Sequence, residues 1–441
     1  GGILADDMGL GKTVQVLSYL LAMKQNGQTL PSLIVCPASL VLNWAEECQK
    51  FTPELSCVVV DGDAAHRAEL AESWPAADLV VTSYDLLRRD EALYEGQEFY
   101  ACILDEAQAI KNHTTQKYKA VCKVRSRVRF ALTGTPVENR LGELWSVFSF
   151  LMPGYLPPYK SFCSRFEKPI VQEEDQTAVR RLNQLTGPFI LRRMKSDVLK
   201  ELPPKTENVY RIELEEEQRK LYLAAVVDAR EKLQAAKPED KMAVFAVLMR
   251  LREICCDPRL IADNWEGGSA KLDACAELVS SAVEGGHRIL LFSQFTSMLE
   301  LLAKRLDAEG ISHFTLQGST PKPVRAELVR RFNGGEVSVF LISLRAGGTG
   351  LNLTAADIVI HYDPWWNVAA QNQATDRAYR IGQQNPVQVY KLIAQDTIEE
   401  KIVELQQAKQ SLADTVTGTA DGAILSMRPD ELLQLLEGSE P

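Results

Sequence analysis

Short apolar runs rich in branched side chains recur along the chain, and they predict strands buried on both faces of parallel sheets. In the first half these runs are 33–36, 57–60, 79–82, 101–104 and 130–132. In the second half they are 288–292, 338–342, 357–360 and 387–393. Helix-like stretches such as 14–23 and 40–51 separate them. The alternation predicts an α/β fold with two lobes, each a mostly parallel sheet flanked by helices.

Between the two strand-rich halves, over roughly 139–268, the pattern becomes helical, most clearly at 213–233 and 242–255. We therefore predict helical insertions between the sheets and place the lobe boundary near Pro204. Lobe 1 is predicted to span 1–204, and lobe 2 to span 205–441 with its own insertion and a C-terminal helix. That helix is predicted from apolar residues at helical spacing and should pack back across the lobes: Ile398, Ile402, Leu405 and Leu412.

Composition narrows the class of protein. With 46% hydrophobic and 24% charged residues, the chain can bury a core, which excludes wholesale disorder. A net charge of −10 argues against basic attraction over the whole surface, so a polyanionic partner must meet a local patch.

The nine cysteines include no C-x-x-C pair, which argues against a zinc site. No apolar run reaches the roughly 18 residues that cross a bilayer, and no signal peptide is visible, so we expect an intracellular fragment or processed chain without a membrane partner.

A glycine-rich segment predicts a phosphate site, at Gly9, Leu10, Gly11, Lys12 and Thr13. It follows an apolar entry and precedes a helical run, the context in which backbone N–H groups and a helix N-terminus surround phosphate oxygens. Lys12 can reach the terminal phosphates, and the Thr13 hydroxyl can ligate Mg²⁺. The first glycine of the usual phosphate-loop pattern is replaced by Asp6. Taken alone, the segment could also be a glycine-rich turn with a surface lysine.

Two adjacent carboxylates strengthen the nucleotide hypothesis. Asp105 and Glu106 follow the apolar run 101–104, at the carboxyl end of a predicted strand, where α/β sheets place their ligand chemistry. There Asp105 can hold the metal while Glu106 polarises the attacking water. A lone Asp-Glu would more often be an acidic helix cap, but together with the upstream loop it favours ATP hydrolysis.

Two further segments are ambiguous when taken singly. Residues 132–136 end a predicted strand with small hydroxyl residues before a proline, which on its own indicates a strand-to-helix turn. Arg377 and Arg380 are three residues apart, so on a helix they share one face and can point together at an anion. Arginine suits the charge that spreads over phosphoryl oxygens, although two arginines on a helix are usually a solvated face.

In order along the chain, these segments and others resemble the SWI/SNF-type chromatin-remodelling ATPases, within the helicase-like superfamily two. The resemblance covers nearly the whole sequence and rests on the succession of motifs: 2–13, 33–37 with Asn43-Trp44, 80–84, 105–108 with Lys111-Asn112, 132–136, 289–295, 343–353, and 363–367 leading into the arginine pair. The Asp-Glu-Ala-Gln sequence at 105–108 resembles bacterial members, which implies a nucleoid location, or a nuclear one in a eukaryote.

The resemblance implies two RecA-like lobes that close over ATP and Mg²⁺ and move along double-stranded DNA without separating its strands. The catalytic positions of the family then match Lys12, Asp105, Glu106, Gln108, Arg377 and Arg380. Its metal ligands match Thr13 and Asp105, and Gly350 is added to the residues expected to bind nucleotide. Gln108 matches the position that couples hydrolysis to the neighbouring motif. Positions associated with DNA are Ser39, Ser83, Ser293, Gln294, Gln317, Gly318, Ser343, Arg345 and Trp366.

A basic stretch is a further candidate for DNA contact or lobe coupling. Between Thr177 and Arg211, eight Lys and Arg residues outnumber three acidic ones, and Arg192, Arg193 and Lys195 lie at its centre. A solvated linker would have the same composition.

The sequence also departs from the family. Gln108 and Tyr379 stand where many members have His, and Val368 replaces a common Pro. An adenine-reading motif that the family places upstream of the phosphate loop is not in this sequence, so we expect a longer protein. Alternatives stay open: a protein-remodelling ATPase acting on RNA polymerase or another DNA-bound protein, an RNA helicase, or a noncatalytic nucleic-acid-binding module.

Overall fold

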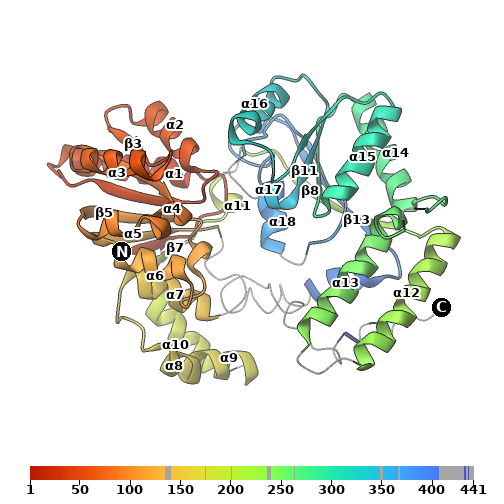
Figure 1. Ribbon diagram of the computed structural model, residues 1–441, viewed down its shortest axis with the longest axis horizontal. Helices are drawn as coiled ribbons and strands as arrows, with labels where there is room; N and C mark the ends of the chain where they lie inside the picture. Colours follow the sequence, from red (N-terminus) through yellow and green to blue (C-terminus); the bar gives the residue numbers. More distant parts are fainter. Residues whose placement is uncertain are drawn as a thin grey trace. The chain divides into compact units, whose positions relative to one another are not determined.

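The chain forms two compact units in a computed structural model (Figure 1). The model describes residues 1–134, 141–173, 175–199, 201–235, 240–262, 264–347, 351–365, 368–406, 432, 433 and 436, with the backbone alone for 196, 241, 322, 345, 347 and 369. The first unit holds the described residues of Gly1–Lys200, and the second holds those from Glu201 onward. The boundary predicted from the sequence lay at Pro204.

The first unit is built on a seven-stranded sheet in the order β3-β4-β2-β5-β6-β1-β7, in which every pairing is parallel. Its strands are β1 (Gly2–Leu4), β2 (Ser32–Cys36), β3 (Cys57–Val59), β4 (Leu79–Ser83), β5 (Glu98–Asp105), β6 (Arg125–Leu132) and β7 (Ile190–Leu191). Because the strands run the same way, their carboxyl ends meet at one edge, where the phosphate loop and the acidic pair both lie.

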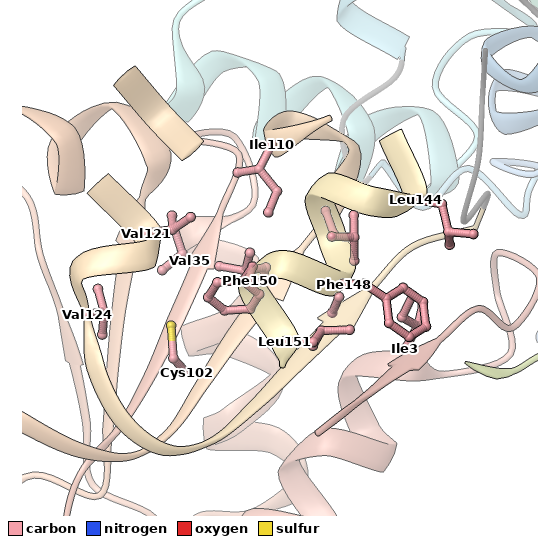
Figure 2. Packing of buried hydrophobic residues seen from close by; sticks show 14 of the residues in the cluster. Ile3, Val35, Cys102, Ile110, Val121, Val124, Leu144, Phe148, Phe150 and Leu151 are labelled. Atoms are coloured by element: carbon pink, nitrogen blue, oxygen red, sulfur yellow. The ribbon is translucent and has the colours of Figure 1, made fainter. Parts of the chain in front are cut away.

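Helices cover both faces of this sheet, which explains why its central strands are continuously apolar. On β2, Leu33 and Val35 face one core, and Ile34 and Cys36 face the other. The second core contains α1 (Lys12–Gln25) and α2 (Val41–Phe51). The first contains residues of α6 (Gln116–Lys123) and α7 (Leu141–Leu151), and Figure 2 shows α7 side chains packed beside Ile3, Val35 and Cys102.

The second unit repeats the design with six parallel strands in the order β10-β11-β9-β12-β13-β8. These are β8 (Lys205–Ile212), β9 (Ile289–Ser293), β10 (His313–Leu316), β11 (Val339–Ser343), β12 (Ile358–His361) and β13 (Val387–Ala394). One core joins the sheet to α14 (Ala270–Glu284) and α15 (Thr296–Ala308). The opposite core joins it to α16 (Lys322–Asn333), α17 (Leu344–Gly347) and α18 (Val368–Thr375). The prediction of two lobes, each a parallel sheet between helices, is confirmed.

Additional helices surround the sheets. The first unit also contains α3 (Ala64–Ser73), α4 (Tyr84–Arg89), α5 (Glu91–Glu95), α8 (Tyr159–Phe162), α9 (Lys168–Gln172), α10 (Gln176–Thr186) and α11 (Lys195–Val198). In the second unit, α12 (Glu216–Ala235) and α13 (Lys241–Cys256) form a core with a helix at 398–406. Ile398 and Ile402 are buried there, so this helix packs on α12 and α13 of its own unit; Leu412 lies outside the described residues.

The region 139–268, predicted as helical, also contains two strands, β7 and β8. β8 has an almost entirely exposed, polar sequence and pairs with β13 along one side only. Such an edge strand lacks the apolar run from which the other strands were predicted.

Candidate nucleotide and nucleic-acid site

The phosphate loop connects β1 to α1 at the carboxyl edge of the first sheet. Gly9 and Gly11 have φ of 86° and 74°, a left-handed conformation that glycine adopts at little cost, and Gly11 caps the helix. The Lys12 ammonium donates to the Asp6 carbonyl at 2.7 Å and to the Asp7 carbonyl at 3.3 Å. The first-turn N–H groups of an α-helix have no intrahelical acceptor, so Gly11, Lys12 and Thr13 begin a helix whose N-terminus favours an anion.

Asp105 ends β5, opposite Leu132 of β6. Its Oδ2 accepts a hydrogen bond from the Trp44 indole N–H at 2.9 Å, and its Oδ1 accepts one from the Glu106 backbone N–H at 2.9 Å. Burial raises the pKa of Asp105, against the opposing effects of the Trp44 hydrogen bond and the Lys12 charge. The charge of the phosphate-loop lysine thus favours the ionised form of the predicted metal carboxylate.

Glu106 adopts an unusual backbone conformation, with φ 50° and ψ 56°. Left-handed geometry at a residue other than glycine costs on the order of 1 kcal/mol and is often found at functional sites. Glu106 lies directly before the turn 107–110, and this turn brings the Gln108 side chain back to the Glu106 carboxylate.

Gln108 joins the acidic pair to the next predicted motif. Its amide donates to Glu106 Oε2 at 2.8 Å, and its amide oxygen accepts from the Thr133 hydroxyl at 3.2 Å. The Thr133 backbone N–H in turn donates to the Leu4 carbonyl on β1, at 3.1 Å. The residue that replaces the usual His thus makes a hydrogen-bonded chain from Glu106 to Thr133. Residues 135 and 136 of that motif lie outside the described part.

Arg377 and Arg380 do not share a helix, so that sequence prediction is wrong. α18 ends at Thr375, and the arginines follow in turns closed by bonds from the backbone N–H groups of Arg377 to Ala374 O and of Gln383 to Arg380 O. Arg377 is buried, and Arg380 Nη1 donates to the Leu351 carbonyl at 3.4 Å.

Several serines that matched DNA-associated positions cap chain turns instead of pointing freely to solvent. The Ser83 and Ser343 hydroxyls accept from the backbone N–H groups of Leu86 and Ala346, at 3.2 and 3.3 Å. The buried Ser293 hydroxyl donates to Asp363 at 2.6 Å. These contacts fix the chain at the carboxyl ends of β4, β9 and β11.

The remaining DNA candidates lie on both units. Ser39 is half-buried in the turn before α2, and Gly318 is exposed next to Gln317, whose backbone N–H donates to the Thr320 hydroxyl at 3.1 Å. The Gln294 backbone N–H donates to Asp363 at 3.2 Å. Gly350, Trp366 and the side chain of Arg345 fall outside the described part of the structure.

The basic candidates differ from one another. Arg192 is exposed, and Lys195 is buried with its backbone N–H bonded to Asp7 Oδ2 at 3.0 Å. The Arg193 guanidinium is bonded to the Asp6 carboxylate at the phosphate loop. This contact directs the guanidinium of Arg193 towards the phosphate loop, because the buried Asp6 charge attracts it.

Two contributors to the site were not assigned a role from the sequence. Trp44 belonged to a recognised motif, but nothing in its local pattern indicates that its indole reaches Asp105. Asp6 stands where the phosphate-loop pattern has its first glycine, and this departure is its local signal. In both cases the contact joins residues far apart in the chain, so a motif position alone does not predict it.

The donor set fits Mg²⁺, which keeps several waters and is usually held by one or two carboxylates together with substrate phosphates. Asp105 and the Thr13 hydroxyl would be the protein's part of such a set. Among the described residues no group of three or more His, Cys, Asp or Glu forms a metal cage, and a magnesium site of this kind does not need one. No helix in the described ranges is long and apolar enough to cross a membrane.

Comparison with known proteins gives matches over both units. Residues 1–260 match the SNF2-related domain, and residues 270–382 match the helicase conserved C-terminal domain. The chain is 41% identical over 99% of its length to a protein of Mycoplasma pneumoniae named "Uncharacterized ATP-dependent helicase", of which it covers 42%. It is 36% identical over 99% of its length to the mouse SWI/SNF-related matrix-associated actin-dependent regulator of chromatin subfamily A member 1, covering 43% of that protein.

A further relative is the TATA-binding protein-associated factor mot1 of Aspergillus fumigatus, which is 35% identical over 100% of this chain and of which the chain covers 27%. The chain thus spans less than half the length of each of these three relatives.

Proposed function

The chain belongs to the SNF2-related family, and on this basis we propose that it is an ATP-dependent motor that moves along double-stranded DNA without separating its strands. The observation that carries the proposal is the hydrogen-bonded chain from Glu106 through Gln108 to Thr133, beside a phosphate loop whose lysine acts on Asp105. A noncatalytic binding module has no need for this combination.

In this proposal the phosphate loop binds ATP. The N–H groups at the start of α1 and the Lys12 ammonium hold the phosphate oxygens, and Thr13 and Asp105 would hold Mg²⁺. Bound there, Mg²⁺ would supply positive charge that neutralises the phosphates. Glu106 accepts a hydrogen bond from the attacking water and polarises it.

Arg377 and Arg380 of the second unit act on the terminal phosphoryl group. A guanidinium stays charged and offers a planar set of donors, so it stabilises the charge that spreads over the equatorial oxygens during transfer. Binding of ATP favours the closed arrangement of the two units, and loss of phosphate removes that preference. Cycles of closing and opening, with each unit holding the DNA backbone in turn, then move the duplex.

Contacts to DNA should be made mainly to phosphates, through backbone N–H groups, hydroxyls and basic side chains such as Arg192. Binding of this kind is independent of sequence and weakens with salt. The decisive experiment measures ATP turnover of the purified protein without nucleic acid and with duplex DNA, single-stranded DNA or RNA, at two salt concentrations. Stimulation by duplex DNA above the others supports the proposal, and turnover that is indifferent to duplex DNA contradicts it.

A second candidate, a remodelling ATPase whose load is a DNA-bound protein, is favoured by the relative named for its association with the TATA-binding protein. RNA polymerase is one such load. Turnover that rises with RNA polymerase in the absence of DNA would favour this candidate over the DNA motor.

The Gln108 contacts should couple hydrolysis to DNA. Thr133→Val keeps the side-chain shape but removes the hydroxyl that donates to Gln108. Because a neutral hydrogen bond contributes about 1 kcal/mol, we expect DNA stimulation to fall about fivefold, with a smaller change in basal turnover. Thr186→Val, which removes a hydroxyl bonded to Leu182 O within α10, serves as the control. If DNA stimulation were unchanged in Thr133→Val, the hydrogen bonds from Glu106 through Gln108 to Thr133 would have no part in coupling hydrolysis to DNA.

Trp44 should fix the orientation of the metal carboxylate. Trp44→Phe retains an aromatic ring but removes the N–H that donates to Asp105. Partners of metal ligands typically contribute 10–100-fold in metal affinity, so we expect the Mg²⁺ concentration for half-maximal turnover to rise about tenfold. Trp145→Phe, which removes a similar bond to the Pro157 carbonyl, should leave the Mg²⁺ dependence unchanged. Identical Mg²⁺ curves for both variants would rule out this role for Trp44.

A further inference from the structure

An ion pair with a buried carboxylate joins the phosphate loop to a residue 187 positions later in the chain. The Arg193 Nε lies 3.1 Å from both Asp6 carboxylate oxygens, its Nη2 also donates to Asp6 Oδ2, and its backbone N–H donates to Asp6 Oδ1 at 3.0 Å. The Asp6 side chain is 0% exposed, whereas that of Arg193 is 41% exposed. Arg193 therefore supplies most of the positive charge and hydrogen bonds that stabilise the buried Asp6 carboxylate, because a buried carboxylate without a partner is strongly destabilising.

Gln15 completes the arrangement from the first turn of α1. Its side-chain amide donates to Asp6 Oδ2 at 3.2 Å and to the Leu10 carbonyl at 3.1 Å, and its amide oxygen accepts from Arg193 Nη2 at 2.6 Å. Burial on its own raises the pKa of Asp6, but the hydrogen bonds from Arg193 and Gln15 outweigh it and the pKa is lowered. Asp6 is thus held as the carboxylate at neutral pH.

The same residue also holds the catalytic lysine. While the Asp6 carboxylate accepts from Arg193, the Asp6 carbonyl accepts from the Lys12 ammonium at 2.7 Å. A shift of the Asp6 backbone therefore changes the position of Lys12. Arg193 controls that backbone through the carboxylate and, additionally, through its own carbonyl, which accepts from the Asp7 N–H at 3.1 Å.

The chain that contains Arg193 runs beside the loop and then enters the second unit. Leu191 O accepts from Ala5 N at 2.7 Å, and the Lys195 N–H donates to Asp7 Oδ2 at 3.0 Å. The second unit begins at Glu201 and its edge strand β8 at Lys205. A displacement of this connecting segment, defined here as 191–199, is transmitted to the loop by these bonds.

We propose that Arg193 is a positioning residue that couples the phosphate loop to the connecting segment, rather than a contact to DNA. Through Asp6 it sets the position of Lys12, so that movement of the second unit alters nucleotide affinity and bound nucleotide restrains the segment. The inference rests on the proposed function for its DNA-dependent part, but its effect on nucleotide binding can be measured without DNA.

The test compares Arg193→Gln, Asp6→Asn and the double variant with the parent protein. Affinity for a fluorescent ATP analogue is measured without DNA, turnover is measured with and without duplex DNA, and duplex affinity is measured without nucleotide at two salt concentrations. Since a hydrogen bond to a charged group contributes about tenfold or more to an equilibrium, we expect each single variant to weaken nucleotide binding about tenfold. The double variant should be no weaker than either single one, because both remove the same interaction.

Arg67→Gln is a matched control. Arg67 is buried in the same unit and makes a similar two-pronged contact with Asp90, through Nε at 2.6 Å and Nη2 at 2.8 Å, but touches nothing at the loop. It should lower the melting temperature without changing nucleotide affinity. Arg193→Lys keeps the charge but lacks the planar set of donors through which Arg193 contacts Asp6 and Gln15. It should weaken nucleotide binding by an intermediate factor, and it tests the inference even if Arg193→Gln folds poorly.

The inference is overturned if Arg193→Gln and Arg193→Lys bind nucleotide normally but lose duplex affinity with a smaller salt dependence, which is the behaviour of a phosphate contact. Additive losses in the double variant also overturn it. If the parent protein shows no DNA stimulation, the proposed motor function fails, whereas the nucleotide affinities of the variants still decide the role of Arg193.

Discussion

Glu106→Gln is expected to bind ATP as well as the parent protein and to hydrolyse it about 10³-fold more slowly, since a positioned general base contributes typically 10²–10⁴-fold. The substitution is nearly isosteric and removes only the charge that polarises water. The amide oxygen of the new side chain can still accept from Gln108, whose Nε2 lies 2.8 Å from Glu106 Oε2. Phosphate release under steady-state conditions, together with the affinity of a fluorescent ATP analogue, separates the two effects.

Glu98→Gln provides the control, because it makes the same substitution at the opposite end of the same strand, β5. Glu98 is exposed and pairs with Arg127, and it should keep full turnover. If Glu106→Gln retained more than a tenth of the parent rate, the water would have to be activated by another group. Loss of ATP binding together with turnover would instead indicate that Glu106 supports the architecture of the loop.

Most of the strands that were predicted from the sequence are buried on both faces, and the half-buried edge strand β3 is the exception. Ile289 to Phe292 on β9 alternate between two cores, so each position is apolar and the run is unmistakable. The three strands that the sequence analysis missed, β7, β8 and β10, all lie at sheet edges. An edge strand is paired on one side only, and in β8 most side chains are exposed, so tertiary pairing rather than local pattern decides its conformation.

The candidate site shows the same division between local and distant information. The phosphate loop and the acidic pair are short segments whose residue types and neighbours suffice to indicate their chemistry. The contacts of Trp44 with Asp105 and of Arg193 with Asp6 join residues 61 and 187 positions apart, and no local pattern encodes them. The helix predicted for Arg377 and Arg380 was wrong for another reason. A spacing of three residues is compatible both with a helix and with the turns that follow α18.

Arg377→Gln is expected to reduce turnover about 10³-fold while ATP and duplex DNA still bind, because an arginine that stabilises the transferred phosphoryl group contributes 10³–10⁵-fold to kcat. The Arg377 backbone is held on both sides, with its N–H donating to Ala374 O at 3.2 Å and its carbonyl accepting from Leu353 N at 3.1 Å. The substitution therefore removes the charge without releasing the turn. Single-turnover hydrolysis measured with saturating ATP and duplex DNA reports the chemical step alone.

Arg330→Gln on α16 is the matched control, since its side chain is 74% exposed and is bonded to Glu327 in the same helix. It should hydrolyse ATP at the parent rate. Arg377→Lys distinguishes charge from geometry: a point charge without the planar set of donors should restore only part of the rate. Because Arg377 is buried, a melting curve must show that the variant is folded. Full turnover by a folded Arg377→Gln would exclude this arginine from phosphoryl transfer and leave Arg380 as the one arginine of the proposed pair.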